Sequence, residues 1–139
     1  MGLGFFLHAG ELNSAKTWTL EIEYHGAVVR NPISTTITID SRGKITLKKS
    51  DQMETLAKNI TEDDLTKLKT AINKAYLLNQ RDVDYAHERC VGSKGATVSY
   101  ALGEKTNKFE IHGSALCNIK SRKLKNLVDE IKQLQIKYF

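Results

Sequence analysis

Five stretches of the chain alternate apolar and polar residues, and this period of two predicts strands. In the first stretch, from Thr17 to Tyr24, Trp18 and Leu20 share one face while threonine and glutamate share the other. The other four stretches are Ile33–Asp40, the residues around Ile45 and Leu47, Ala96–Leu102, and the residues around Phe109 and Ile111. Turns that contain Gly43 and Gly103 follow directly on strands, so we expect the neighbouring strands to form antiparallel hairpins.

A helix is predicted from Thr61 to about Leu77, because apolar residues recur there every three or four positions. The Thr61 hydroxyl can accept a backbone N–H of the first turn, and Asp64 can reach back to the Thr61 amide, as in a capping box. Ile60 and Leu65 fit a hydrophobic staple around this start. The start of this helix is therefore well defined by the sequence.

A second helix is predicted to begin between Asn118 and Ser121 and to run close to Phe139. Its apolar stripe consists of Leu124, Leu127, Val128, Ile131 and Leu134. Its opening is basic, with Lys120, Arg122, Lys123 and Lys125 at the end where the helix dipole favours acids. We favour interpreting this basic patch as a solvated surface, and the alternative is a site for an anionic partner.

The order of these elements, β-β-β-α-β-β-α, predicts one α+β domain over residues 17–139, with a mostly antiparallel sheet and both helices packed on one face. A chain of 139 residues is long enough to bury a core without metals. The exposed face of the sheet is expected to carry Glu21, Glu23, Thr36 and Thr38.

The net charge of +5 permits an anionic partner, but the positive residues are scattered along the chain, so we do not expect nucleic acid. No apolar run approaches the roughly 18–20 residues of a membrane span. The sequence contains no glycine-rich phosphate loop, nucleophile elbow or paired-histidine zinc motif. We therefore expect a non-enzymatic protein without a cofactor, whose partner is another protein.

Residues 1–16 are set apart from the predicted domain. The apolar segment Leu3–Leu7 precedes Asn13–Ala15, a segment of residues with small side chains. This pattern is typical of the end of a secretory signal peptide. The alternative interpretation is a flexible N-terminal arm. A signal-peptide remnant predicts a secreted or periplasmic protein, whereas an arm also allows a cytoplasmic one.

The connection Asn79–Gly95, between the first helix and the next strand, is long and polar, and connections of this length are usually functional or mobile. We expect Gln80–Gly95 to be the contact surface, because loops on rigid scaffolds commonly carry recognition. The candidate binding residues of this loop are Asp82, Asp84, Tyr85, His87, Glu88 and Arg89.

The chain has two cysteines, Cys90 in this loop and Cys117 before the last helix. A disulfide between them is the favoured interpretation for an exported protein, and it would tether the loop to the start of the last helix. The alternatives are two free buried thiols, or a zinc site in which His87 and His112 complete the ligand set.

The helix start Thr61–Leu65, the apolar segment Tyr76–Leu78 and a hairpin on either side form a pattern that resembles small bacterial exported domains of unknown function, often lipoproteins. The outline is also similar to emfourin, a proteinaceous inhibitor of thermolysin-like metalloproteases. This resemblance implies a secreted binding protein and identifies no functional residue. No lipobox cysteine stands near the N-terminus, which counts against a lipoprotein.

The favoured function is thus a non-enzymatic exported binding domain, in its finer form an inhibitor of a secreted enzyme. The first alternative is a binder of nucleic acid or an anionic surface through Lys120–Lys125. The second alternative is a small hydrolase that uses His87, His112 and nearby acids.

The disulfide can be tested by intact-mass analysis without reductant. Cys90 precedes the predicted hairpin Ala96–His112 by about as many residues as Cys117 follows it, so the two thiols are expected to emerge at the same end of the sheet and to bond. The expected mass is lower than that of the reduced chain by the two thiol hydrogens. Two free thiols without bound metal would contradict both the disulfide and the zinc site.

Overall fold

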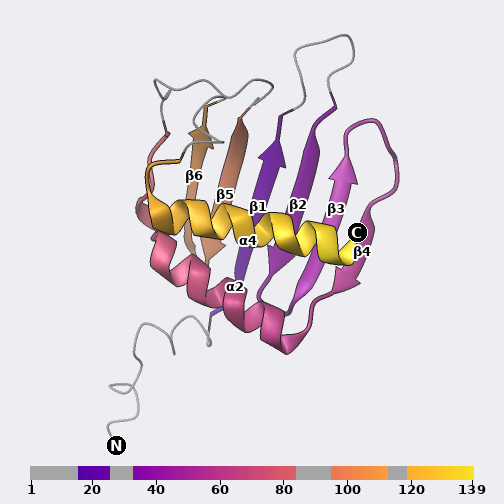
Figure 1. Cartoon of the computed structure of the whole chain (residues 1–139), viewed down its shortest axis with the longest axis horizontal. Coiled ribbons are helices and arrows are strands. Elements are labelled where there is room, and N and C mark those ends of the chain that lie inside the picture. Colours follow the sequence, from indigo (N-terminus) through magenta and orange to yellow (C-terminus); the bar gives the residue numbers. More distant parts are fainter. Residues whose placement is uncertain (1–15, 26–32, 84–94, 113–118) are drawn as a thin grey trace, which may run out of the picture.

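The computed structural model describes residues 16–25, 33–83, 95–112 and 119–139, which form an antiparallel sheet covered by two long helices. The strands are β1 (Trp18–Tyr24), β2 (Thr35–Asp40), β3 (Lys44–Lys49), β4 (Leu56–Asn59), β5 (Ala96–Leu102) and β6 (Lys105–Ile111). Their order across the sheet is β4-β3-β2-β1-β5-β6 (Figure 1). The predicted single α+β domain and its two hairpins, β2–β3 and β5–β6, are confirmed.

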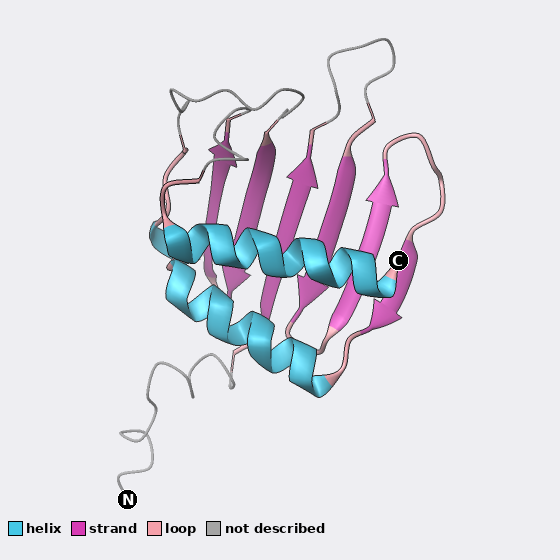
Figure 2. Cartoon of the chain, in the orientation of Figure 1, coloured by secondary structure: helices cyan, strands magenta, loops and turns pink. Residues whose placement is uncertain are grey.

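The two helices lie on one face of the sheet and run in opposite directions (Figure 2). Helix α2 (Glu62–Ala75) follows β4, and the 3-10 helix η2 (Leu77–Asn79) comes directly after it. Helix α4 (Arg122–Tyr138) begins on the β6 side of the sheet and ends beside β4 (Figure 1).

The core fills the space between the sheet and the helices. The strands contribute Trp18, Leu20, Ile22, Ile37, Ile39, Ile45, Leu47, Val98, Tyr100, Phe109 and Ile111, all buried. Helix α2 adds Leu68 and Ile72, and α4 adds the whole predicted stripe from Leu124 to Leu134. Burial of each such aliphatic side chain contributes about 1.5–3 kcal/mol. The alternation in the strands and the stripes on the helices therefore account for the assembly of the two layers.

The strand β4 was missed by the sequence pattern. Its four residues are all exposed, so no alternation between buried and exposed side chains marks them. The strand pairs with β3, and beyond its end the Ile60 N–H donates to the Gly43 carbonyl at 2.8 Å. The observed order is consequently β-β-β-β-α-β-β-α.

The predicted staple residues Ile60 and Leu65 both lie against the turn at Gly43. A Cβ atom added to Gly43 would stand 3.4 Å from Leu65 Cδ2 and 3.5 Å from Ile60 Cγ1, and the φ angle of this glycine is +88°. Glycine therefore serves two needs here, because it adopts the left-handed backbone of the turn and admits the two apolar side chains.

Helix α2 ends two residues earlier than the sequence predicted. Tyr76 has a left-handed backbone, with φ 49° and ψ 53°, and this conformation stops the helix after Ala75. The second hairpin turns tightly at Gly103, because β5 ends at Leu102 and β6 already begins at Lys105.

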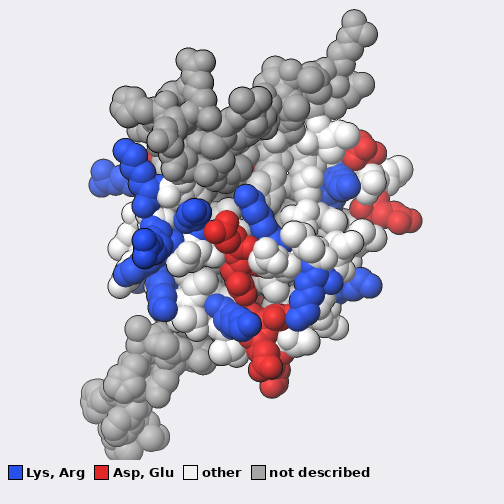
Figure 3. Space-filling view, in the orientation of Figure 1, with Lys and Arg blue, Asp and Glu red and all other residues white. Residues whose placement is uncertain are grey.

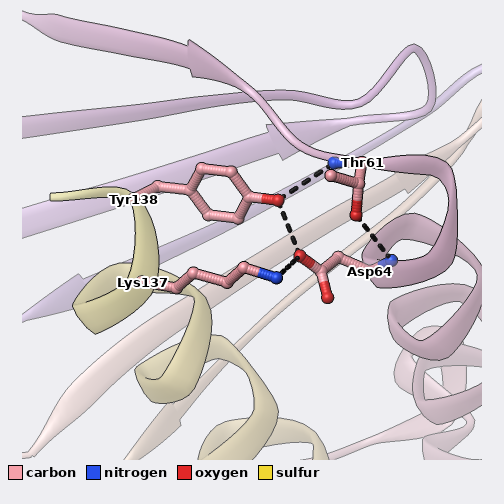
Figure 4. A network of polar contacts seen from close by, with 4 residues as sticks. All are labelled: Thr61, Asp64, Lys137 and Tyr138. Carbon is pink, nitrogen blue, oxygen red and sulfur yellow. Dashed lines mark hydrogen bonds and ion pairs between the residues drawn. The ribbon is translucent and has the colours of Figure 1, made fainter.

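The start of α2 and the end of α4 are joined by a polar network (Figure 4). The Thr61 hydroxyl accepts the Asp64 N–H at 3.2 Å, which confirms Thr61 as the N-cap. The predicted return bond from Thr61 N–H to Asp64 runs instead through Tyr138, whose hydroxyl accepts that N–H at 3.0 Å and donates to Asp64 Oδ2 at 2.6 Å. Lys137 Nζ also donates to Asp64 Oδ2, at 2.7 Å.

Hydrogen bonds from Lys137 and Tyr138 lower the pKa of Asp64 from 3.8 to about 2. The Asp64 side chain is only 13% exposed, so its charge is held among these partners rather than in open water. A lowered folded-state pKa means that the charged network adds stability above the unfolded pKa of 3.8, and that this stability is lost as the pH falls toward 2.

We therefore expect Asp64→Asn to destabilise the domain at about pH 6 and to have a smaller effect at about pH 2.5, where wild-type Asp64 begins to be protonated in the folded state. Urea unfolding at the two pH values measures this difference. The matched control is Glu62→Gln, which removes another carboxylate of the first turn of α2 outside the network of Figure 4. Equal pH dependence in the two variants would contradict a special role for Asp64.

Candidate functional site

The segment that leads into the predicted binding loop is bound to the edge of β6. Val83 forms a parallel bridge with Ile111, its N–H donates to the Glu110 carbonyl at 2.7 Å, and its carbonyl accepts the His112 N–H at 3.0 Å. Asp82 Oδ1 accepts the Glu110 N–H at 2.9 Å. Of the predicted binding residues, Asp82 thus has a structural contact on the sheet edge. The others, Asp84, Tyr85, His87, Glu88 and Arg89, lie outside the described residues.

Side-chain amides hold the chain between α2 and this segment. Gln80 Nε2 donates to the Ala75 carbonyl at 2.7 Å, so a carbonyl at the end of α2 has a partner. Asn107 Nδ2, from β6, donates to the carbonyls of Leu77 at 2.7 Å and Gln80 at 2.9 Å. These bonds fix η2 against the sheet and so determine where Tyr76 stands.

The cysteine predictions fall outside the described residues, because neither Cys90 nor Cys117 is among them, and the zinc alternative also needs His87. His112 is exposed at the end of β6. In the described part of the chain, no group of three or more His, Cys, Asp and Glu side chains could hold a metal ion.

One buried polar side chain lies near the loop end of the sheet. Thr97 is 7% exposed, and its hydroxyl donates to Glu110 Oε1 at 3.4 Å and lies 2.9 Å from His25 Nε2. The hydroxyl therefore has two partners, which offsets the cost of burying it.

The predicted basic patch lies in the open at the start of α4. Lys120, Arg122, Lys123 and Lys125 are all exposed. The helix begins at the N-cap Ser121, whose hydroxyl accepts the Leu124 N–H at 3.3 Å. Lys and Arg side chains gather on the side of the molecule where α4 begins (Figure 3). The cap supplies the first turn with a hydrogen-bond acceptor that the basic side chains cannot supply.

An aromatic side chain that the sequence pattern did not indicate lies beside this patch. The Lys123 ammonium lies 5.7 Å from the centre of the Tyr76 ring, within reach of a cation–π interaction. Tyr76 is 64% exposed, although aromatic rings are usually buried. Tyr76 and Lys123 are far apart in the sequence, and the structure brings them together because α2 ends where α4 begins.

The Tyr76 ring borders a pocket of about 190 Å³. The pocket is lined by Ile72, Asn73, Tyr76, Leu77, Leu78, Asn79, Tyr100 and Leu102. An apolar cavity of about 150 Å³ is enough to hold a benzene ring. The pocket is therefore large enough for one apolar side chain of a partner, and the lysine beside it supplies positive charge. We call Tyr76, Lys123 and this pocket the Tyr76 site.

A second hollow lies on the open face of the sheet and has a volume of about 330 Å³. Its lining residues are Thr19, Glu21, Ser99, Tyr100, Ala101, Thr106, Asn107 and Lys108, four of which carry hydroxyl groups and two of which carry opposite charges. Its one aromatic lining residue, Tyr100, is buried, so this hollow has no exposed ring like that of Tyr76.

Comparison of the chain with protein-family models and with curated proteins finds no match. The resemblance to exported domains and to emfourin therefore stays a prediction. In the described residues, neither helix has the length and apolarity needed to span a membrane.

The contact made by Asp82 can be tested by amide hydrogen exchange. We expect Asp82→Ala to speed exchange of the Glu110 amide, because this N–H loses its acceptor at the sheet edge. The Phe109 amide serves as an internal reference on the same strand. Unchanged exchange at Glu110 would show that Asp82 does not hold the edge.

Proposed function

We propose that this chain is a non-enzymatic binding domain that holds an acidic segment of another protein at the Tyr76 site. The proposal keeps the protein partner expected from the sequence and moves the contact surface from the loop Gln80–Gly95 to a site beside it. A secreted or periplasmic location, and inhibition of a secreted enzyme as the finer form of the function, are part of the same proposal.

The observation that carries the proposal is the conformation of Tyr76. A left-handed residue at a helix C-terminus is usually glycine, because a side chain costs energy in this conformation. Here the position holds a large ring that is mostly exposed and contributes little to the core. Strained backbone and exposed aromatic rings are both concentrated at binding sites. A role in recognition accounts for a ring at a position where glycine would be less strained.

The surroundings of the ring favour an acidic polypeptide. The pocket beside Tyr76 has aliphatic walls at Ile72 and Leu77, which suit a leucine or phenylalanine side chain of the partner. Lys123 and the rest of the basic patch suit carboxylates on either side of that anchor. An apolar anchor between acidic residues would therefore contact both features together.

Nucleic acid is the second candidate, because an exposed ring beside lysines can stack on a base. A single ring gives one stacking platform, whereas single-strand binders usually place several aromatic side chains along a groove. The described basic patch supplies positive charge without further rings. The peptide is therefore the better fit, and the two ligands can be compared directly.

The proposal is tested by NMR titration of the labelled protein with two probes of equal net charge, an acidic peptide with a central leucine and an oligothymidylate. We expect the peptide to shift the amides of Tyr76, Leu78 and Lys123. Tyr76→Gly should abolish these shifts while leaving thermal stability equal or higher, because glycine relieves the left-handed backbone.

Two lysine variants distinguish peptide binding at the Tyr76 site from general electrostatic attraction to the protein. Lys123→Gln should weaken peptide binding, and Lys132→Gln, which removes the same charge further along α4, should weaken it less. A protein that binds only the oligonucleotide, or a peptide that shifts no amide near Tyr76, would overturn the proposal.

A further inference from the structure

The two edge strands of the sheet differ in how far their outer backbone groups are hydrogen-bonded. At the β6 edge, Val83 and Asp82 occupy backbone groups of the strand. At the opposite edge, β4 pairs with β3 on its inner side, and none of the described residues pairs with its outer side. An open strand edge is a template for another strand.

The hydrogen bond between Ile60 and Gly43 determines which groups of β4 face outward. Inward and outward bonding alternate along an antiparallel strand, so Leu56 and Lys58 bond inward like Ile60. Ala57 and Asn59 therefore present their N–H and C=O groups at the open edge. By the same alternation the Thr61 N–H points away from β3, and it donates to the Tyr138 hydroxyl.

The side chains along this edge have a self-complementary pattern. Leu56 stands opposite Leu47 and Lys58 opposite Ile45, so both belong to the face that the helices cover. Glu54 lies two residues before Leu56, outside β4, so it joins that face only if the strand is extended backward by two residues on pairing. Leu56 is 47% exposed, which leaves an apolar residue unburied between an acid and a base.

We propose that β4 is a self-association edge, at which two copies of this chain pair their β4 strands antiparallel about a two-fold axis at Leu56. In this register Leu56 packs on Leu56 of the second copy. Glu54 lies opposite Lys58 of the second copy, and symmetry repeats the pair. The outward groups of Ala57 exchange hydrogen bonds with Thr55 of the second copy, so one sheet continues through both molecules.

The charges along β4 favour this register, and they favour a second copy of the chain as the partner. An axis at Lys58 would set two lysines opposite each other, which is unfavourable across a strand pair. An axis at Ala57 would place Leu56 opposite Lys58 and leave Glu54 without a basic partner. Only the axis at Leu56 pairs both charges and buries the leucine. The edge therefore matches its own sequence, and a foreign strand would need the same spacing of charges.

The contact is small, because few residues of each strand meet, and small interfaces form weak complexes. The test is sedimentation velocity of the full chain over a concentration series. We expect a monomer–dimer equilibrium in the wild type. Glu54→Lys and Lys58→Glu should each weaken it about tenfold or more, because each change opposes like charges at both symmetric pairs.

Combining the two charge changes makes the test specific to this register. An equimolar mixture of the Glu54→Lys and Lys58→Glu proteins should form a heterodimer, since lysine then faces glutamate at both pairs. The double variant should self-associate like the wild type. Glu104→Lys, in the exposed turn between β5 and β6, is the control for charge alone and should leave the equilibrium unchanged.

A wild type that stays monomeric at all concentrations would overturn the proposal. A dimer that both single variants leave intact, or single variants that fail to recover association on mixing, would overturn it equally.

Discussion

The sheet has one apolar face, and the burial of that face under α2 and α4 is the constraint on which the rest of the structure depends. Residues with almost no exposure come from both layers, such as Phe109 in the sheet, Leu68 in α2 and Leu127 in α4. Apolar contact is not directional, so it leaves the helices free to slide. Their positions are set by polar groups at the two ends.

A group of polar contacts of this kind lies near each edge of the sheet. Near β4, Asp64 joins the start of α2 to the last turn of α4. Near β6, Asn107 holds the chain that follows α2. Asn107 holds the backbone at Leu77 and Gln80, directly after Tyr76. In the proposed function, this anchoring would reduce the ordering that a ligand must impose on the site.

Local patterns were enough to predict most of the fold. The alternation of β5 predicted its observed bounds, Ala96–Leu102, and the spacing of apolar residues predicted every buried position of α4. β4 could not be found in this way, since its four residues are all exposed and its pairing with β3 is a tertiary contact. The link from Thr61 to Asp64 through Tyr138 was equally hidden, because Thr61 and Tyr138 are 77 positions apart in the sequence.

The candidate site was predictable only in part. The basic patch is a run of neighbouring residues, so the sequence displayed it directly. The contact between Tyr76 and Lys123 depends on two helix ends meeting, which the sequence does not display. The left-handed backbone of Tyr76 could not be predicted either, because glycine is the residue expected in that conformation. Asp82 was selected as a binding residue because of its polar loop, whereas its hydrogen bond to Glu110 needs the tertiary fold.

The contrast between the two edges of the sheet also limits how large an assembly of this protein can become. A sheet that accepts strands on both sides can add copies without end, as in a fibre. In the described chain Asp82 and Val83 bond to the backbone of Glu110 and His112, so the end of the β6 edge is already occupied, whereas none of the described residues pairs with the outer side of β4. The proposed pairing through β4 uses the open edge of both molecules and so gives a closed dimer. The short segment along β6 disfavours extension of such a dimer by a further strand at that end of the sheet.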